Sequence, residues 1–387
     1  MLDKSLKVAV LIRHYNASAG GAERYCVELT KRLAKIYDVH VFTQHNSEQS
    51  DNITFHKIPQ WLQRPRYLNQ LFFSWLTRRS TQNKFDIVHS HDMVTHANIY
   101  TLHVPCVRTK WSESKGVRKT LRWLNTLLSP RKIAYLWLEN SEMKPSKIRH
   151  FISVSDYLSR NILMNYPNID QHLTLAYPGI NNSKNALLDV ASQPNTLKKK
   201  LKLNDDDFLF LFVGNDLIKK GLPAIIETFM MLDNNRIHLA IVGNGKKDKV
   251  RIPTNLESNI HFLGVINNMI DLYRESDCLI HPTLVDTYGM VVLEAMSAKL
   301  PVIVSNKKYC GFAEHLDDNQ ALILDNPKDS VELLKKINLI VSDVDLRKNI
   351  ARNGFDKSQS ITWENTLEQT LFAYNIILKN KKDHYEG

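Results

Sequence analysis

Apolar runs of strand length alternate along the chain with segments whose apolar residues recur at helical spacing. Continuous apolar strands joined by helices are typical of buried parallel sheets built from βαβ units. After the first run, residues 6–12, one apolar helical face is formed by Ala22, Cys26, Leu29, Leu33 and Ile36. The expected strands are residues 6–12, 38–43, 85–91, 98–104, 150–155 and 173–180, then 208–214, 237–243, 260–264, 277–282 and 301–305.

The pattern pauses after residue 180 and restarts at residue 208. The polar stretch between them is broken by Pro194 and is typical of a linker. We therefore predict an α/β protein with two Rossmann-like domains facing across a cleft, with the boundary near residues 178–179. Ligands of such folds bind beyond the carboxyl ends of the strands, so the cleft is the expected site.

Composition is that of a soluble globular protein, with 43% hydrophobic and 24% charged residues among 387. The four cysteines are scattered without a CxxC pair, which favours a reduced, cytoplasmic protein. The first apolar run is too short for a signal sequence. No stretch approaches the roughly 20 apolar residues that a membrane-spanning helix needs.

The excess of positive over negative charge lies entirely in the first half of the chain. Residues 1–180 hold 25 Lys and Arg against 13 Asp and Glu, a net charge of +12, whereas residues 181–387 carry −1. The N-terminal half is therefore expected to meet an anionic partner.

The stretch "HPTLVDTYGMVVLEAMSAKLPVIVS", residues 281–305, places two acids around a predicted helix N-terminus. The amides of Gly289, Met290 and Val291 would be the unpaired donors of that helix and could hold a phosphate. Asp286 precedes them and Glu294 lies about one turn into the helix. The two carboxylates would bracket a molecule with phosphate in the middle and hydroxyls at both ends, as in a nucleotide sugar. The alternative is a capping Asp and a Glu that favours the helix dipole.

Three further motifs follow predicted strands. "FVGNDLIKKGL" puts Lys219 and Lys220 at the start of a helix, where a solvated face is the alternative. "NASAGGAERY" puts Gly20 and Gly21 where a backbone can approach a ligand closely, although no GxGxxG is present. "TLHVP" puts His103 at a strand end, where it can be structural or bind a ligand. His89 and His91 of "VHSHD" are interpreted as structural support.

Residues 286–302, "DTYGMVVLEAMSAKLPV", resemble the E-x7-E motif of retaining glycosyltransferases of family 4, which have the two-domain GT-B fold. The chain departs from the family pattern at Asp286, Thr287 and Lys299. The resemblance implies that Lys219 and Lys220 grip the donor diphosphate and that the glycine pair lines the sugar-phosphate side. It also implies that His103 and Asp286 position the donor sugar and that Glu294 holds the ribose.

Within the family, "VGNDLIKKG" and "YCGFAEHL" look most like lipopolysaccharide core glucosyltransferases. The resemblance implies retaining transfer of a hexose from a nucleotide diphosphate sugar, expected to be UDP-linked, to a membrane-associated glycan such as lipopolysaccharide core. Residues 1–179 would bind the acceptor and residues 180–362 the nucleotide sugar, with a final helix over 363–387 that can cross back to the first domain. No metal or other cofactor is expected, since Asp343–Asp345 is a poor DxD.

Residues 107–132 hold eight Lys and Arg and one acid, and apolar residues recur within them at helical spacing. A basic amphipathic helix suits the surface of an anionic bilayer. The predicted membrane-facing residues are Arg118, Lys119, Arg122 and Trp123. We therefore expect the protein to be cytoplasmic and peripherally associated with the inner face of the plasma membrane. An ordinary helix packed on the sheet is the alternative, and no nucleic-acid signature accompanies the charge.

Two other functions remain open from the sequence. A nucleotide-sugar epimerase of related two-domain fold would isomerise a donor without an acceptor. A non-catalytic nucleotide or nucleic-acid binder would use the basic surface without turnover.

Overall fold

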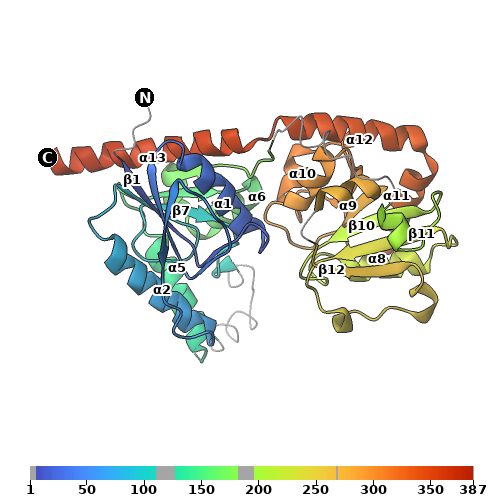
Figure 1. Cartoon of the computed structure of the whole chain (residues 1–387), viewed down its shortest axis with the longest axis horizontal. Helices are drawn as coiled ribbons and strands as arrows, with labels where there is room; N and C mark the ends of the chain where they lie inside the picture. The colour runs from blue at the N-terminus through green and yellow to red at the C-terminus, as the bar shows by residue number, and fades with distance from the viewer. Residues whose placement is uncertain (1–5, 110–125, 127, 182–195, 267–268, 387) are drawn as a thin grey trace. The chain divides into compact units, whose positions relative to one another are not determined.

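The chain forms two compact α/β units (Figure 1). The computed structural model describes residues 6–109, 126, 128–181, 196–266 and 269–386. The N-terminal unit comprises Met1–Gly179 together with Trp363–Gly387, and the C-terminal unit comprises Ile180–Thr362. Each unit is built on a parallel sheet, which confirms the predicted α/β class with two Rossmann-like domains.

Seven parallel strands form the sheet of the N-terminal unit, in the order β5-β3-β1-β6-β7-β8-β9. Every residue of β6, β7 and β8 is buried, the pattern of a sheet covered on both faces. The strands are β1 (Lys7–Leu11), β3 (Asp38–Thr43), β5 (Ile53–Lys57), β6 (Ile87–Ser90), β7 (Ile99–Leu102), β8 (His150–Ser153) and β9 (Leu173–Leu175), with β2 (His14–Tyr15) and β4 (His45–Asn46) in a separate pair. The helices are α1 (Gly21–Leu33), α2 (Arg66–Thr81), α5 (Pro130–Glu142), α6 (Asp156–Asn165) and the 3-10 helix η1 (Pro167–His172).

The last helix, α13 (Trp363–Glu386), packs in the N-terminal unit against α1, β6, β8 and β9. Figure 1 shows it in red along this unit. Trp363 and Tyr374 are buried, and Thr366 donates from its hydroxyl to the carbonyl oxygen of Tyr177. The end of the chain therefore completes the core of the N-terminal unit.

Six parallel strands form the sheet of the C-terminal unit, in the order β12-β11-β10-β13-β14-β15. The strands are β10 (Phe208–Val213), β11 (Ile237–Val242), β12 (Ile260–Gly264), β13 (Cys278–His281), β14 (Val302–Ser305) and β15 (Leu322–Leu324). The helices are α7 (Thr196–Lys200), α8 (Leu222–Met230), α9 (Met269–Glu275), α10 (Met290–Ser297), α11 (Ser330–Ser342) and α12 (Val344–Gln359), with 3-10 helices η2 (Lys247–Lys249), η3 (Thr254–Leu256) and η4 (Gly311–His315).

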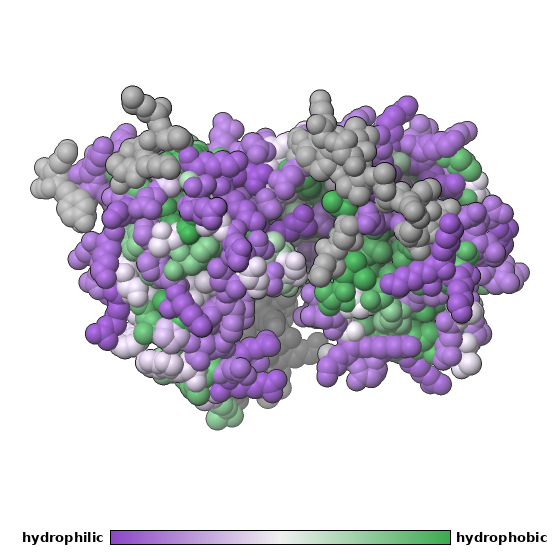
Figure 2. All heavy atoms as spheres, in the orientation of Figure 1, coloured by the Kyte–Doolittle hydropathy of each residue, from purple (hydrophilic) through white to green (hydrophobic). Residues whose placement is uncertain are grey.

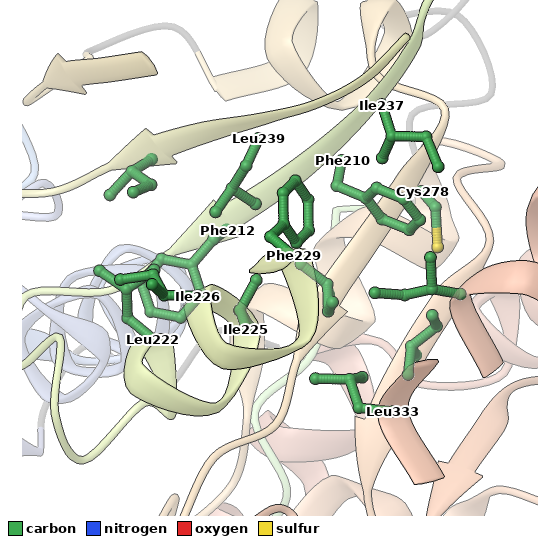
Figure 3. Packing of buried hydrophobic residues seen from close by; sticks show 14 of the residues in the cluster. Phe210, Phe212, Leu222, Ile225, Ile226, Phe229, Ile237, Leu239, Cys278 and Leu333 are labelled. Carbon is green, nitrogen blue, oxygen red and sulfur yellow. The ribbon is translucent and has the colours of Figure 1, made fainter. Parts of the chain in front are cut away.

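The core of the C-terminal unit joins β10 to α8 and α11 (Figure 3). Phe210 and Phe212 of β10 are fully buried, and the rings of Phe210 and Phe229 lie 6.3 Å apart. Leu333 of α11 belongs to the same cluster. Burying each such side chain contributes roughly 1.5–3 kcal/mol, so this core holds α8, and the turn that precedes it, in a fixed place.

In both sheets the strand order reverses between two neighbouring strands, β1 and β6 in one unit and β10 and β13 in the other. Open α/β sheets bind ligands at the carboxyl ends of the strands beside such a reversal. Glycines 20 and 21 follow β1, the lysine pair follows β10, and the acid-bracketed helix follows β13. The fold therefore places the predicted motifs at the carboxyl edges of the two sheets.

Some elements differ from the sequence-based expectation. The helix expected to start at the lysine pair begins instead at Leu222, as α8 (Leu222–Met230), because Gly221 at its N-cap has a left-handed φ of 87°. Strands β5 and β15 were not predicted. β5 carries a single buried residue, and β15 has three residues, so neither gives a continuous apolar run of strand length.

His89 of β6 is a neutral group in the core of the N-terminal unit. Its ring nitrogens lie 2.7 Å from the Thr101 hydroxyl and 2.9 Å from the Tyr374 hydroxyl. Burial, with a smaller contribution from His103, lowers the pKa of His89 to about 3. In the unfolded chain the pKa returns to about 6.5. Below that value the unfolded chain binds a proton that the folded chain does not, so stability is complete above about pH 6.5 and is lost as pH falls.

We expect the urea midpoint of the N-terminal unit to fall from pH 7.5 to pH 5, and to fall less steeply in His89→Gln. One proton contributes about 1.4 kcal/mol per pH unit. All six tryptophans belong to the N-terminal unit, so tryptophan fluorescence follows its unfolding. The exposed His45 provides a control, His45→Gln, with the wild-type slope. Equal slopes in His89→Gln and wild type would contradict the assignment.

Candidate functional site

In the C-terminal unit, the turn after β10 lies directly against the segment after β13. The Lys219 carbonyl oxygen accepts from the Leu284 amide at 2.8 Å and from the Thr283 hydroxyl at 3.3 Å. Gly221 makes this approach possible, because a β-carbon there would lie 1.9 Å from the Pro282 carbonyl oxygen. Two segments that are distant in sequence are thereby held together at the carboxyl edge of the sheet.

Lys220, Asp286 and His281 form a hydrogen-bonded group at this edge. The Lys220 ammonium donates to Asp286 Oδ2 in an ion pair, and His281 Nε2 lies 3.1 Å from the same oxygen. The backbone of Asp286 is paired as well, since its amide donates to the Tyr309 carbonyl at 2.8 Å and its carbonyl accepts from the Gly311 amide at 3.0 Å. The carboxylate is therefore held in one position.

Charge and burial act in opposite directions on Asp286. Burial would raise the pKa of this carboxyl group, but the hydrogen bond from His281 and the positive charge of Lys220 outweigh it and lower the pKa. Burial also lowers the pKa of His281, against the attraction of Asp286. The group therefore consists of an ionised carboxylate, an ammonium and a histidine whose charged form is disfavoured.

Lys219 is placed differently from its neighbour. Its side chain is 68% exposed and forms an ion pair with Asp216 at 3.0 Å within the same turn. Such exposed pairs contribute about 0–1 kcal/mol, so a ligand anion can replace Asp216 at little cost. The structure brings Lys220, and not Lys219, to Asp286.

The N-terminus of α10 begins at the end of the loop that carries Asp286. Its N-cap, Gly289, has a φ of 102°, and a β-carbon there would lie 2.6 Å from Cys310 Sγ. The amides of Met290 and Val291 are in the first turn, where helix N–H groups have no intrahelical acceptor. Both residues are half-buried. This end of the helix therefore has N–H groups that can donate to an anion.

Glu294 lies on α10 one turn further on and is held by a tyrosine. The Tyr273 hydroxyl, on α9, donates to Glu294 Oε2 at 2.8 Å. Tyr273 is buried, whereas Glu294 is half-buried. Glu294 is therefore a fixed carboxylate on the same helix as the first-turn amides.

In the N-terminal unit, Gly20 is the N-cap of α1 and Gly21 is its first residue. A β-carbon at Gly21 would meet nothing within 4 Å, and one at Gly20 would meet the carboxylate oxygen of Glu23, at the end of a flexible side chain. The chain itself therefore leaves open space at the start of α1. This is the arrangement expected where a ligand approaches the backbone.

His103 follows β7 and lies against a second histidine. Its Nε2 lies 3.0 Å from His91 Nδ1, and the two rings are stacked with centroids 5.3 Å apart. The Tyr25 ring packs edge-on to His103. Burial lowers the pKa of His103 to about 4. His103 is therefore a neutral ring at the same edge of the sheet as the glycine pair.

Four residues of these two edges were missed by sequence reasoning. His281 and Tyr273 orient the predicted carboxylates, and Arg13 and Asp92 form an ion pair at the β1–β6 reversal, with 2.8 Å between Arg13 Nη2 and Asp92 Oδ1. A polar residue at the end of a predicted strand was the available signal for His281, Arg13 and Asp92. Nothing in the sequence separates Tyr273 from an ordinary core tyrosine.

The predicted membrane-facing residues Arg118, Lys119, Arg122 and Trp123 lie outside the described residues. Within the described part of the chain, no cluster of three or more His, Cys, Asp or Glu side chains could hold a metal ion. No helix in the described ranges is both long and apolar enough to cross a membrane.

Comparison with known proteins assigns the chain to a class. Residues 19–184 match the family model for Glycosyltransferase Family 4, and residues 194–357 match that for Glycosyl transferases group 1. The lipopolysaccharide glucosyltransferase WaaG of Escherichia coli K12 is 23% identical over 295 residues, 74% of this chain and 76% of WaaG. An uncharacterized glycosyltransferase of Methanocaldococcus jannaschii is 24% identical over 309 residues, 77% of each chain.

Solved structures show the same fold. The crystal structure of WaaG, described as a glycosyltransferase involved in lipopolysaccharide biosynthesis, has a TM-score of 0.80 at 21% identity and covers 96% of this chain and 99% of its own. Anabaena HepE in complex with UDP and glucose has a TM-score of 0.70 at 15% identity, with coverage of 96% and 99%. The resemblance inferred from the sequence is thus confirmed, and the chain is a glycosyltransferase of the GT-B type, related to the lipopolysaccharide glucosyltransferase WaaG.

Proposed function

We propose that this glycosyltransferase transfers a hexose, with retention of configuration, from a UDP-linked donor to a membrane-associated glycan such as lipopolysaccharide core. The observation that carries the proposal is the Lys220–Asp286–His281 group beside the N-terminus of α10. It combines a fixed carboxylate, an ammonium and first-turn amides within one unit. Sugar hydroxyls and a diphosphate need these complementary groups.

Each group has one role in the proposed donor complex. The first-turn amides of α10 and the Lys220 ammonium bind the diphosphate, because an ammonium that donates to Asp286 keeps two further N–H donors. Glu294, held by Tyr273, accepts from the ribose hydroxyls. Asp286 accepts from the sugar through Oδ1, which has no partner among the described residues. Lys219 exchanges Asp216 for phosphate.

The proposed reaction is a substitution on one face of the sugar. The bond from the anomeric carbon to the diphosphate oxygen breaks, and a bond to the acceptor oxygen forms on the same side. The acceptor proton passes to the departing diphosphate oxygen. Lys220 and the helix N-terminus stabilise the negative charge that grows on the diphosphate. No divalent cation is needed in this scheme.

The proposed acceptor is held at a membrane by exposed aromatic and basic side chains of α2 and α5. These helices pack against each other. Trp75 of α2 is 48% exposed and Trp137 of α5 is 55% exposed, and Arg79 lies over the Trp75 ring at 4.9 Å. Figure 2 shows hydrophobic residues at the lower end of the unit that carries these helices in Figure 1. Tryptophan and arginine together suit the interface of an anionic bilayer.

The proposal is tested first by donor turnover. The protein is incubated with UDP-, GDP- and ADP-linked hexoses, with and without a lipopolysaccharide-type glycolipid, and nucleoside diphosphate release is measured. We expect release from a UDP-hexose that rises with glycolipid and persists in EDTA, and a product with the anomeric configuration of the donor. An inverted product, or an isomerised donor formed without an acceptor, would contradict the proposal.

Glu294→Ala is expected to raise the donor KM by about 10- to 100-fold, since a hydrogen bond to a charged group contributes about 1.5–3 kcal/mol. Tyr273→Phe removes this one hydrogen bond from the Glu294 carboxylate and is expected to raise the donor KM less, by up to about tenfold. Steady-state kinetics against donor concentration measure both effects. Glu227, an exposed acid on α8, provides the control Glu227→Ala. A wild-type donor KM in Glu294→Ala would refute the ribose role.

Replacing Trp75 and Trp137 together by alanine is expected to lower binding to phosphatidylglycerol-containing vesicles about tenfold or more. Co-sedimentation at physiological salt measures the bound fraction. Phe372, a 57% exposed aromatic of α13, supplies the control Phe372→Ala. A second variant, with Arg118, Lys119 and Arg122 replaced, tests the contribution of positive charge. It is also expected to lower vesicle binding, because each such residue near an anionic surface contributes about 1 kcal/mol. Unchanged sedimentation of both variants would exclude this surface.

A further inference from the structure

The contact between His91 and His103 bears on how His103 can act in the proposed reaction. His91 Nδ1 and His103 Nε2 are 3.0 Å apart, which is hydrogen-bond distance. Both rings are half-buried, and burial lowers the pKa of each. Two neutral imidazoles share one hydrogen in such a bond, so one ring donates and the other accepts. Which ring donates decides what His103 offers to a ligand.

The second nitrogen of His91 indicates the direction of this bond. His91 Nε2 is buried and has no hydrogen-bond partner among the described residues. If His103 donated, the hydrogen of His91 would lie on Nε2 and be a buried N–H without an acceptor. Orphaned buried N–H groups are rare in native proteins. If His91 donates from Nδ1, its buried Nε2 carries a lone pair and no hydrogen, so no buried N–H is left without an acceptor.

The surroundings of His91 hold its ring in this orientation. The His89 ring is stacked on it with centroids 4.5 Å apart, and the Tyr25 ring lies 5.9 Å away. His89 is fixed in turn by hydrogen bonds to Thr101 and to Tyr374 of α13. His91 cannot turn its ring over without displacing this stack, so its Nδ1 stays directed at His103.

We infer that His91 is a positioning residue that donates from Nδ1 to His103 Nε2 and thereby keeps the hydrogen of His103 on Nδ1. His103 Nδ1 has no protein partner among the described residues, so its N–H is available to a ligand oxygen. His103 is thus a hydrogen-bond donor and not a base. This inference rests on the proposed function only for the identity of that oxygen, which would be a hydroxyl of the donor sugar. It also leaves the departing diphosphate as the acceptor of the proton.

The tautomer can be observed directly in the full-length protein without substrate. Long-range ¹H–¹⁵N correlation spectra of ¹⁵N-histidine-labelled protein at pH 8 distinguish a hydrogen on Nδ1 from one on Nε2. His103→Asn identifies the His103 signals by difference. We expect the hydrogen of His103 on Nδ1. A hydrogen on Nε2 in the wild-type protein would overturn the inference, whatever the catalytic activity proves to be.

Asparagine and aspartate at position 91 form a matched pair, because they have the same shape and their side-chain atoms replace Nδ1. His91→Asn keeps a donor and is expected to keep the hydrogen of His103 on Nδ1. His91→Asp offers only acceptor oxygens and is expected to move that hydrogen to Nε2. An unchanged tautomer in His91→Asp would contradict the inference.

Kinetics give a second readout on the same variants. His91→Asp is expected to lower kcat on the order of 100-fold, the effect of losing one oriented donor, whereas His91→Asn loses much less. The control is His56→Asn, which breaks the His40–His56 contact of 2.8 Å elsewhere in the same sheet and should change neither the spectrum of His103 nor kcat. Equal kcat losses in the two position-91 variants would assign His91 a merely structural role.

Discussion

The contact between Gly221 and Pro282 determines the geometry of the site in the C-terminal unit. No side chain can stand between the two backbones, because even a β-carbon would lie within 1.9 Å of the Pro282 carbonyl oxygen. The Lys219 carbonyl oxygen in the turn after β10 can therefore accept hydrogen bonds directly from the segment after β13. Lys220 reaches Asp286 because the two backbones lie this close together. The position of the ion pair therefore depends on Gly221, which itself carries no functional group.

The two units offer different chemistry at their carboxyl edges. In the C-terminal unit, a carboxylate remains ionised although partly buried, because Lys220 and His281 both contact one of its oxygens. In the N-terminal unit, burial keeps His91 and His103 neutral. A charged edge suits a ligand with phosphates, whereas a neutral ring that donates one hydrogen bond suits a hydroxyl.

Sequence reasoning found the strands with continuous apolar runs and the residues that follow them, since these positions share one pattern. Asp286, Glu294 and Lys220 stood out because a charge directly follows an apolar run or begins a helix. His281 and Tyr273 did not, because one is the last residue of a buried strand and the other an inward-facing helical residue. Their roles arise only when parallel strands and neighbouring helices bring distant segments together. Lys219 and Lys220 likewise differ in their partners because their side chains leave the turn in different directions.

The position of α13 has a consequence for the N-terminal site. Tyr374 contacts His89, which stacks on His91, which contacts His103. Residues 1–179 alone would lack Tyr374 and would leave a ring nitrogen of His89 buried without a partner, which is costly. His89 can therefore reach its final hydrogen-bonded arrangement only after α13 has packed against β6. The arrangement of His89, His91 and His103 thus depends on a helix that is distant from them in sequence.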